Sequence, residues 1–114
     1  MQVYNKLVRD KIPDKILRNR TPLEAVRGVK PRVRVLSPKE FKAELRRKLL
    51  EEYNELVSAT TREDILTEMA DLAEVLDALR RAEGIGDTEL MGARAAKNSL
   101  AGAFDKCIFL ETVG

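Results

Sequence analysis

Four acidic residues stand in two pairs of equal spacing. Glu52 and Glu55 are three residues apart, and so are Glu68 and Asp71. Residues three apart lie on the same face of an α-helix, so each pair projects both carboxylates in one direction. If a tight hairpin with its turn near Thr60 joins the two helices, Glu52 and Glu68 come level and all four carboxylates meet. Such a set of oxygen ligands predicts a site for a divalent metal ion.

The helical wheel places these carboxylates among apolar side chains. At about 100° per residue, Glu52 falls inside the apolar stripe of the first helix, and Glu68 lies beside that of the second. The stripes consist of Phe41, Leu45, Leu49, Tyr53 and Leu56, and of Ile65, Met69, Leu72 and Leu76. Carboxylates on an apolar face carry a desolvation penalty unless a cation meets them. A single glutamate here would be an ordinary solvated acid, but the matched set favours a metal site.

The amino-acid composition excludes several catalytic mechanisms and types of metal site. The 114 residues include no histidine, which excludes Ser-His-Asp and Cys-His catalysis and histidine-rich zinc or iron sites. Cys107 is the single cysteine, and without a histidine to activate it we expect an inert thiol. Carboxylates, lysines and arginines remain, and oxygen ligands suit Mg²⁺, Mn²⁺ or Ca²⁺.

Length and hydropathy predict one domain over residues 1–114 and no membrane partner. No apolar run is long enough to span a bilayer, and the first ten residues lack a signal-peptide pattern. We therefore expect a cytoplasmic protein.

The charges divide along the chain. Residues 1–48 hold 15 basic and 5 acidic residues, whereas residues 49–114 hold 6 and 14. A basic arm and an acidic body suit an anionic ligand that arrives with a divalent cation. The same arm would also suit nucleic acid, or attraction between the two parts of the chain. The chain has no tryptophan and only five other aromatic residues for base stacking, so we do not expect nucleic acid to be its partner.

Start and stop signals predict mainly helices. Ser37, Pro38 and Glu40 form a capping box that begins a helix running to about Ser58. Further helices are expected near 10–18, from the cap at 61–64 to Gly84, and over 87–100. Residues 21–31 are expected to form a turn or loop, and short strands are possible at 32–36 and 107–110. The fold class is all-α.

Some apolar residues lie outside the two stripes, and their positions predict that the chain associates with further copies of itself. On a single hairpin, the side chains of Leu50, Val57 and Leu66 would be exposed to solvent. Packing hairpins from two chains into a four-helix core would bury them, so we expect a homodimer or homotetramer.

The opening segment and the acidic pairs together resemble a known family. The segment runs from Tyr4 to Pro13, with the sequence YNKLVRDKIP, and the pairs lie in EEYNE at 51–55 and EMAD at 68–71. The combination is similar to the all-α nucleoside triphosphate pyrophosphohydrolase superfamily, in particular its MazG-like and phosphoribosyl-ATP pyrophosphohydrolase-like members. The resemblance spans nearly the whole chain.

This resemblance implies an Mg²⁺-dependent hydrolase, with Mn²⁺ as a possible substitute. It would cleave a nucleoside triphosphate between its α and β phosphates, giving a monophosphate and pyrophosphate. The implied metal ligands are Glu52, Glu55, Glu68 and Asp71. Independently of the family, hydrolysis of a phosphoanhydride needs an oriented water, and we expect Glu52 or Glu55 to orient it. Enzymatic alternatives include phosphoribosyl-ATP hydrolysis, and non-enzymatic ones a basic-arm nucleic-acid-binding module or an interaction protein.

Five basic residues are the candidate phosphate contacts. Each is equally well explained as a solvated surface charge. They are Lys6, Arg9, Lys11, Lys48 and Lys97. Lys97 and the turn at 102–104 resemble the family's carboxyl-terminal motif, but the chain departs from that pattern at Ala101 and Ala103.

Overall fold

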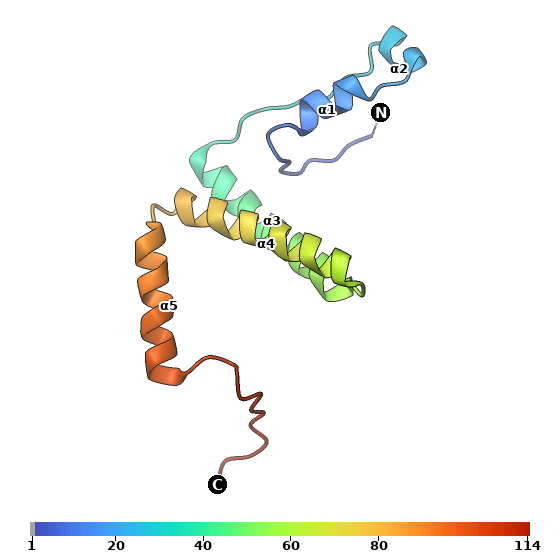
Figure 1. The fold of residues 1–114 in the computed structure, drawn as a ribbon. Helices are drawn as coiled ribbons and strands as arrows, with labels where there is room; N and C mark the ends of the chain where they lie inside the picture. The colour runs from blue at the N-terminus through green and yellow to red at the C-terminus, as the bar shows by residue number, and fades with distance from the viewer. Residues whose placement is uncertain (1) are drawn as a thin grey trace.

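The computed structural model describes residues 2–114, and their regular structure is entirely helical (Figure 1). The helices are α1 (Ile12–Arg18), α2 (Pro22–Val26), α3 (Pro38–Ser58), α4 (Arg62–Ala82) and α5 (Asp87–Ala101). The expected all-α fold is confirmed. Among these helices, none combines the length and the apolar character needed to cross a bilayer.

Helices α3 and α4 form the expected hairpin. The Ser37 hydroxyl accepts a hydrogen bond from the Glu40 amide, and the Glu40 carboxylate accepts one from the Ser37 amide. Thr61 caps α4 by accepting from the Asp64 amide. These caps satisfy amides that have no partner within the helix, so both helices begin at the residues that the sequence predicts. Only residues 59–61 separate the helices, which therefore lie antiparallel (Figure 1).

The hairpin has a very small core. Leu45 on α3 and Val75 on α4 are its buried aliphatic side chains, 3% and 9% exposed. Glu52, 6% exposed, lies buried with them. A carboxylate thus occupies part of the little apolar interior that the described chain has.

Ion pairs hold the open end of the hairpin, where α3 begins and α4 ends. The Glu83 carboxylate accepts a hydrogen bond from the Arg46 guanidinium at 3.0 Å and lies 3.7 Å from the Lys42 amine. Gly84 then turns the chain out of α4 with a φ of 71°, a conformation that costs glycine little. Gly84 therefore lets α4 end and the chain turn toward α5.

The expected loop at residues 21–31 is partly wrong, because Pro22–Val26 forms α2. Thr21 and Glu24 exchange hydrogen bonds in a capping box, and Pro22 occupies the first turn. This is the same arrangement that begins α3. The prolines and glycine nearby suggested a loop, but a proline in the first helical turn is compatible with a helix.

The two possible strands are also wrong, since residues 2–114 contain no strand. Residues 32–36 lie in the connection between α2 and α3, and residues 107–110 lie in the tail after α5. The two segments are far apart in Figure 1, so they do not pair with each other. An alternating pattern without a partner does not make a sheet.

The chain as a whole is extended. Its radius of gyration is 19.6 Å, whereas a compact domain of this length would have about 13 Å. The α3–α4 pair is the one helix pair in residues 2–114 with extensive packing, and α5 projects away from it (Figure 1). The hairpin is therefore the structural centre on which a site can be built.

Candidate metal centre

The hairpin brings the two acidic pairs together. Glu52 and Glu55 project from α3 and Glu68 and Asp71 from α4, and one carboxylate oxygen of each lies within 4.8 Å of the others. The convergence expected from the i,i+3 spacing is confirmed. Four oxygen atoms in so small a space form a cluster that could hold a divalent metal ion.

Two oxygens in this cluster lack any hydrogen-bond partner. Oε2 of Glu52 and Oε2 of Glu68 are both buried and unpaired among the described residues. A buried carboxylate oxygen without a donor costs free energy, because folding removes its water and supplies nothing in return. A bound cation would satisfy both atoms. This pair of orphan oxygens distinguishes the cluster from acids that merely share a surface.

The crowding of these carboxylates raises the pKa of two of them, Glu52 and Glu68. Burial raises the pKa of Glu52 to about 7, with further contributions from the charges of Glu55 and Asp71, while Lys48 acts in the opposite direction. Burial also raises the pKa of Glu68, and the neighbouring Glu55 adds to this effect. Both shifts have one physical origin, because desolvation and nearby negative charge disfavour ionisation. A divalent cation would reverse both effects.

Lys48 is a fixed counter-charge at the inner edge of the cluster. Its amine lies 3.8 Å from Oε1 of Glu52 and donates to both carboxylate oxygens of Glu51 at 3.3 Å. The Lys48 side chain is only 18% exposed. Lys6, from the segment before α1, lies 3.8 Å from Glu51. Of these two predicted phosphate contacts, Lys48 lies against a clustered acid, whereas Lys6 reaches Glu51, the acid that precedes Glu52 in the sequence.

Arg9 reaches the cluster directly. Its guanidinium donates a hydrogen bond of 2.8 Å to Oδ1 of Asp71. The two residues are separated by 62 positions in the sequence, so the N-terminal segment must fold back across the hairpin. Leu7, Val8 and Arg9 border a cleft of about 90 Å³ whose opposite wall includes Glu52 and Asp71. A cleft of this size has room for a few water molecules but not for a nucleotide.

The remaining predicted phosphate contacts lie elsewhere. Lys11 immediately precedes α1 and is exposed, and it forms no ion pair within residues 2–114. Lys97 is exposed on α5, which does not pack on the hairpin. Of the five basic residues, the structure thus gathers Lys6, Arg9 and Lys48 at the acids. Phosphate binding by any of them stays a prediction.

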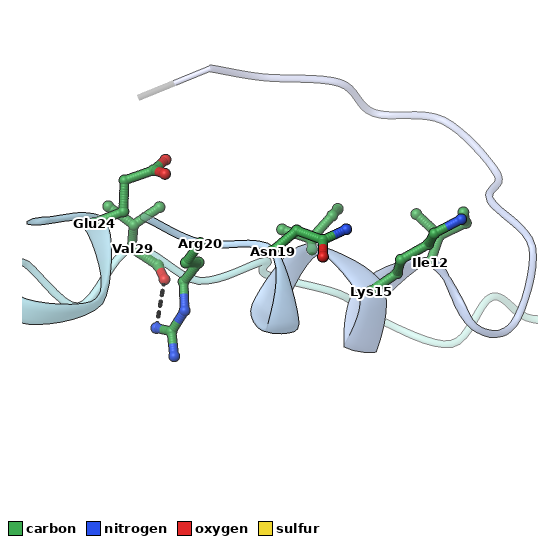
Figure 2. A pocket seen from close by; sticks show the side chains of 7 residues that line it. Ile12, Lys15, Asn19, Arg20, Glu24 and Val29 are labelled. Carbon is green, nitrogen blue, oxygen red and sulfur yellow. Dashed lines mark hydrogen bonds between the residues drawn. The ribbon is translucent and has the colours of Figure 1, made fainter. Parts of the chain in front are cut away.

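A larger hollow lies on the N-terminal arm, away from the acids. It has a volume of about 350 Å³ and is open to solvent. Figure 2 shows side chains from α1, from the link between α1 and α2, from α2 and from the connection after α2. The Arg20 guanidinium, in the link, donates to the Val29 carbonyl at 2.8 Å. Ile12 and Ile16 supply apolar surface, and Lys15 supplies a positive charge. This hollow could not be predicted from the sequence, because it forms where one face of α1 meets Glu24 and Val29, and that contact depends on how the arm folds.

Comparisons of the chain with family models, with curated proteins and with solved structures find no match. The resemblance to pyrophosphohydrolases therefore stays a prediction. What the molecule itself displays is an acidic cluster on a helical hairpin, with two orphan oxygens and three basic residues beside it.

Proposed function

We propose that this chain is a divalent-metal-dependent hydrolase that releases pyrophosphate from nucleoside triphosphates. The observation that carries the proposal is the pair of buried, unpaired oxygens of Glu52 and Glu68 inside a cluster of four carboxylates. A magnesium-type cation suits an all-oxygen donor set of this kind. The histidine-free sequence leaves few other ways to stabilise the charge of a phosphoanhydride.

A cation held by Glu52, Glu55, Glu68 and Asp71 would neutralise the phosphate oxygens during hydrolysis. Water adds to a phosphorus of the α–β bridge, the bond to the bridging oxygen breaks, and a monophosphate and pyrophosphate leave. Glu55 is the acid best placed to orient this water and accept its proton, because it is exposed. Glu52 is almost fully buried, so water reaches it poorly.

The basic residues complete the charge balance. Arg9 and Lys6 approach from the N-terminal segment and Lys48 from α3, so positive charge borders the cluster on more than one side. A triphosphate brings several negative charges, and guanidinium groups bind such oxygens through paired hydrogen bonds. The arrangement supports an anionic substrate that binds together with its cation.

The test is a panel of nucleoside triphosphates, with phosphoribosyl-ATP included as the enzyme alternative. The expected products with Mg²⁺ are a monophosphate and pyrophosphate, and chelation should abolish turnover. Release of orthophosphate without added pyrophosphatase would contradict cleavage at the α–β bridge. A chain that binds nucleic acid but releases no pyrophosphate would favour the basic-arm binding module instead.

We also propose that the working unit contains at least two chains. Leu50, Val57 and Leu66 are 59%, 66% and 66% exposed on the hairpin. The cleft beside the acids is too small for a nucleotide, so further walls are needed. A second hairpin packed against the first would bury these side chains and supply those walls.

A further inference from the structure

We propose that Arg9 is an exchangeable counter-ion, which pairs with Asp71 in the metal-free protein and transfers to substrate phosphate once a cation binds the cluster. This inference rests on the proposed function and concerns the order of binding at that site. It makes Arg9 both a competitor of the metal and a contact of the nucleotide.

Arg9 is paired with one of the clustered acids. Asp71 is one of the four clustered acids, and its Oδ1 accepts from the Arg9 guanidinium at 2.8 Å. Within residues 2–114, this is the one ion pair that joins a clustered acid to a residue outside the hairpin. The charge of Asp71 is therefore already partly neutralised before any cation arrives.

The ion pair between Arg9 and Asp71 is exposed enough to break. The Arg9 side chain is 59% exposed and that of Asp71 is 33% exposed. Exposed ion pairs add little stability, since water screens them and both side chains lose freedom. Lys48 contrasts with Arg9, because its side chain is only 18% exposed and comes from α3 itself. Arg9 is thus the counter-ion that can leave.

Once released from Asp71, the Arg9 guanidinium stays beside the cleft. A divalent cation near Asp71 repels the guanidinium and takes up the carboxylate's charge. The Arg9 backbone stays in place, because its carbonyl accepts from the Ile12 amide at 3.1 Å at the start of α1. A freed guanidinium therefore remains at the edge of the cleft that Arg9 borders. Phosphate oxygens bind a guanidinium through paired, charge-assisted hydrogen bonds, so a substrate in this cleft would offer Arg9 a new partner.

The test compares wild type with Arg9→Gln by calorimetry, using Mn²⁺ alone and then imidodiphosphate at saturating Mn²⁺. The second probe carries the phosphate chemistry shared by all nucleoside triphosphates and needs no choice of base. Arg9→Gln should bind Mn²⁺ about two- to fivefold tighter, because the competing ion pair is gone. It should bind imidodiphosphate about tenfold more weakly, because a charge-assisted hydrogen bond is lost.

Exchange predicts that Arg9→Gln changes the two affinities in opposite directions, with Mn²⁺ bound more tightly and imidodiphosphate more weakly. A purely structural role for Arg9 does not predict this. If Arg9 merely anchored the N-terminal segment, its loss would leave Mn²⁺ binding unchanged or weaken it. Arg18→Gln is the matched control, since Arg18 is exposed on α1 and forms no ion pair in the described chain. This control should bind both probes as wild type does. Mn²⁺ binding by Arg9→Gln that is no tighter than wild type overturns the proposal.

A second measurement needs no variant. The NMR signal of the Arg9 Nε–H group should shift when Mg²⁺ is added and shift again with imidodiphosphate. A signal that Mg²⁺ leaves unchanged overturns the exchange even if pyrophosphate release is found, and the proposed function then stands alone. A wild-type chain that binds no Mn²⁺ overturns both, because the metal centre itself is lost.

Discussion

Glu68 offers a direct residue-scale test of the metal centre. Glu68→Gln keeps the size of the side chain but removes the charge and one potential ligand oxygen. We expect turnover to fall by about 100-fold or more, because charge stabilisation at the reacting phosphate is lost. Mn²⁺ calorimetry and pyrophosphate release measure the two effects.

Glu63→Gln is the control for this change. Glu63 lies on the same helix, is exposed and forms no ion pair within residues 2–114. Circular dichroism should show equal helix content in both variants, since neither removes apolar volume. Undiminished turnover in Glu68→Gln would contradict the assignment of the site.

The raised pKa of Glu52 predicts how the stability of the metal-free protein depends on pH. Its pKa is about 7 in the folded chain and 4.5 as an ordinary carboxyl. Between pH 4.5 and about pH 7, Glu52 carries a proton in the folded state but has lost it in the unfolded state. The free energy of unfolding therefore falls as pH rises through this range. The stabilising effect of protonation is complete below about pH 4.5 and is lost as pH passes about 7.

The measurement is thermal unfolding in chelator between pH 5 and 8. The midpoint should fall over this range in wild type, and Glu52→Gln should reduce the slope. Glu40 has the opposite shift, with a pKa lowered to about 2 by Arg34 and the Ser37 cap, but its effect occurs below this range. Adding Mg²⁺ should raise the midpoint most at the alkaline end, where no proton has to be displaced. A midpoint independent of pH would contradict the burial of Glu52.

At the scale of helices, the hairpin depends on very few side chains. Leu45 is 3% exposed against α4, and Val75 faces it from that helix. Leu45→Ala should therefore destabilise the protein by about 2–5 kcal/mol, through lost burial and the cavity it leaves. Urea unfolding at fixed protein concentration measures the change.

Val35→Ala is the comparison for Leu45→Ala. Val35 is 97% exposed in the connection before α3. Its truncation should change the free energy of unfolding by less than about 0.5 kcal/mol. Equal effects of the two substitutions would mean that the hairpin core lies elsewhere.

Much of this element-scale arrangement could be predicted from the sequence, because the decisive signals are local. The caps at Ser37 and Thr61 predicted where α3 and α4 begin, and the i,i+3 spacing predicted the acidic cluster. Each signal involves residues within one or two helical turns. Local hydrogen bonding and helix periodicity determine such features largely without the rest of the chain.

Other features could not be predicted, because they depend on contacts distant in the sequence. The Arg9–Asp71 pair spans 62 positions, and no period links its two residues. The wheel placed Tyr53 and Met69 in the apolar stripes, yet they are 53% and 55% exposed. Which side of a broad stripe faces the partner helix depends on how the helices cross.

At the scale of the whole molecule, a single chain exposes too much surface. Its accessible area is 10429 Å², whereas a folded monomer of 12.9 kDa would expose about 6,300 Å². The tail after α5 contributes to this excess, with Phe104 and Phe109 97% and 87% exposed. An excess of this size is comparable to the surfaces buried in obligate assemblies.

Light scattering at micromolar concentration should therefore give a mass of at least two chains. Val57→Lys should shift the mass toward one chain, because a charge would enter the apolar contact. Thr67→Lys, at an exposed polar position on α4, should leave the assembly intact. A mass of 12.9 kDa with full activity would mean that one chain builds the site alone.

The burial of Glu52 beside Leu45 and Val75 has an evolutionary consequence. Replacing a buried carboxylate with an aliphatic residue often raises the free energy of unfolding. Selection for stability and selection for activity therefore oppose each other at this position. A descendant that no longer needed the metal would gain stability by exchanging this glutamate for leucine or methionine. The residue found at the position of Glu52 in related chains would then indicate which lineages have kept the chemistry and which have kept only the scaffold.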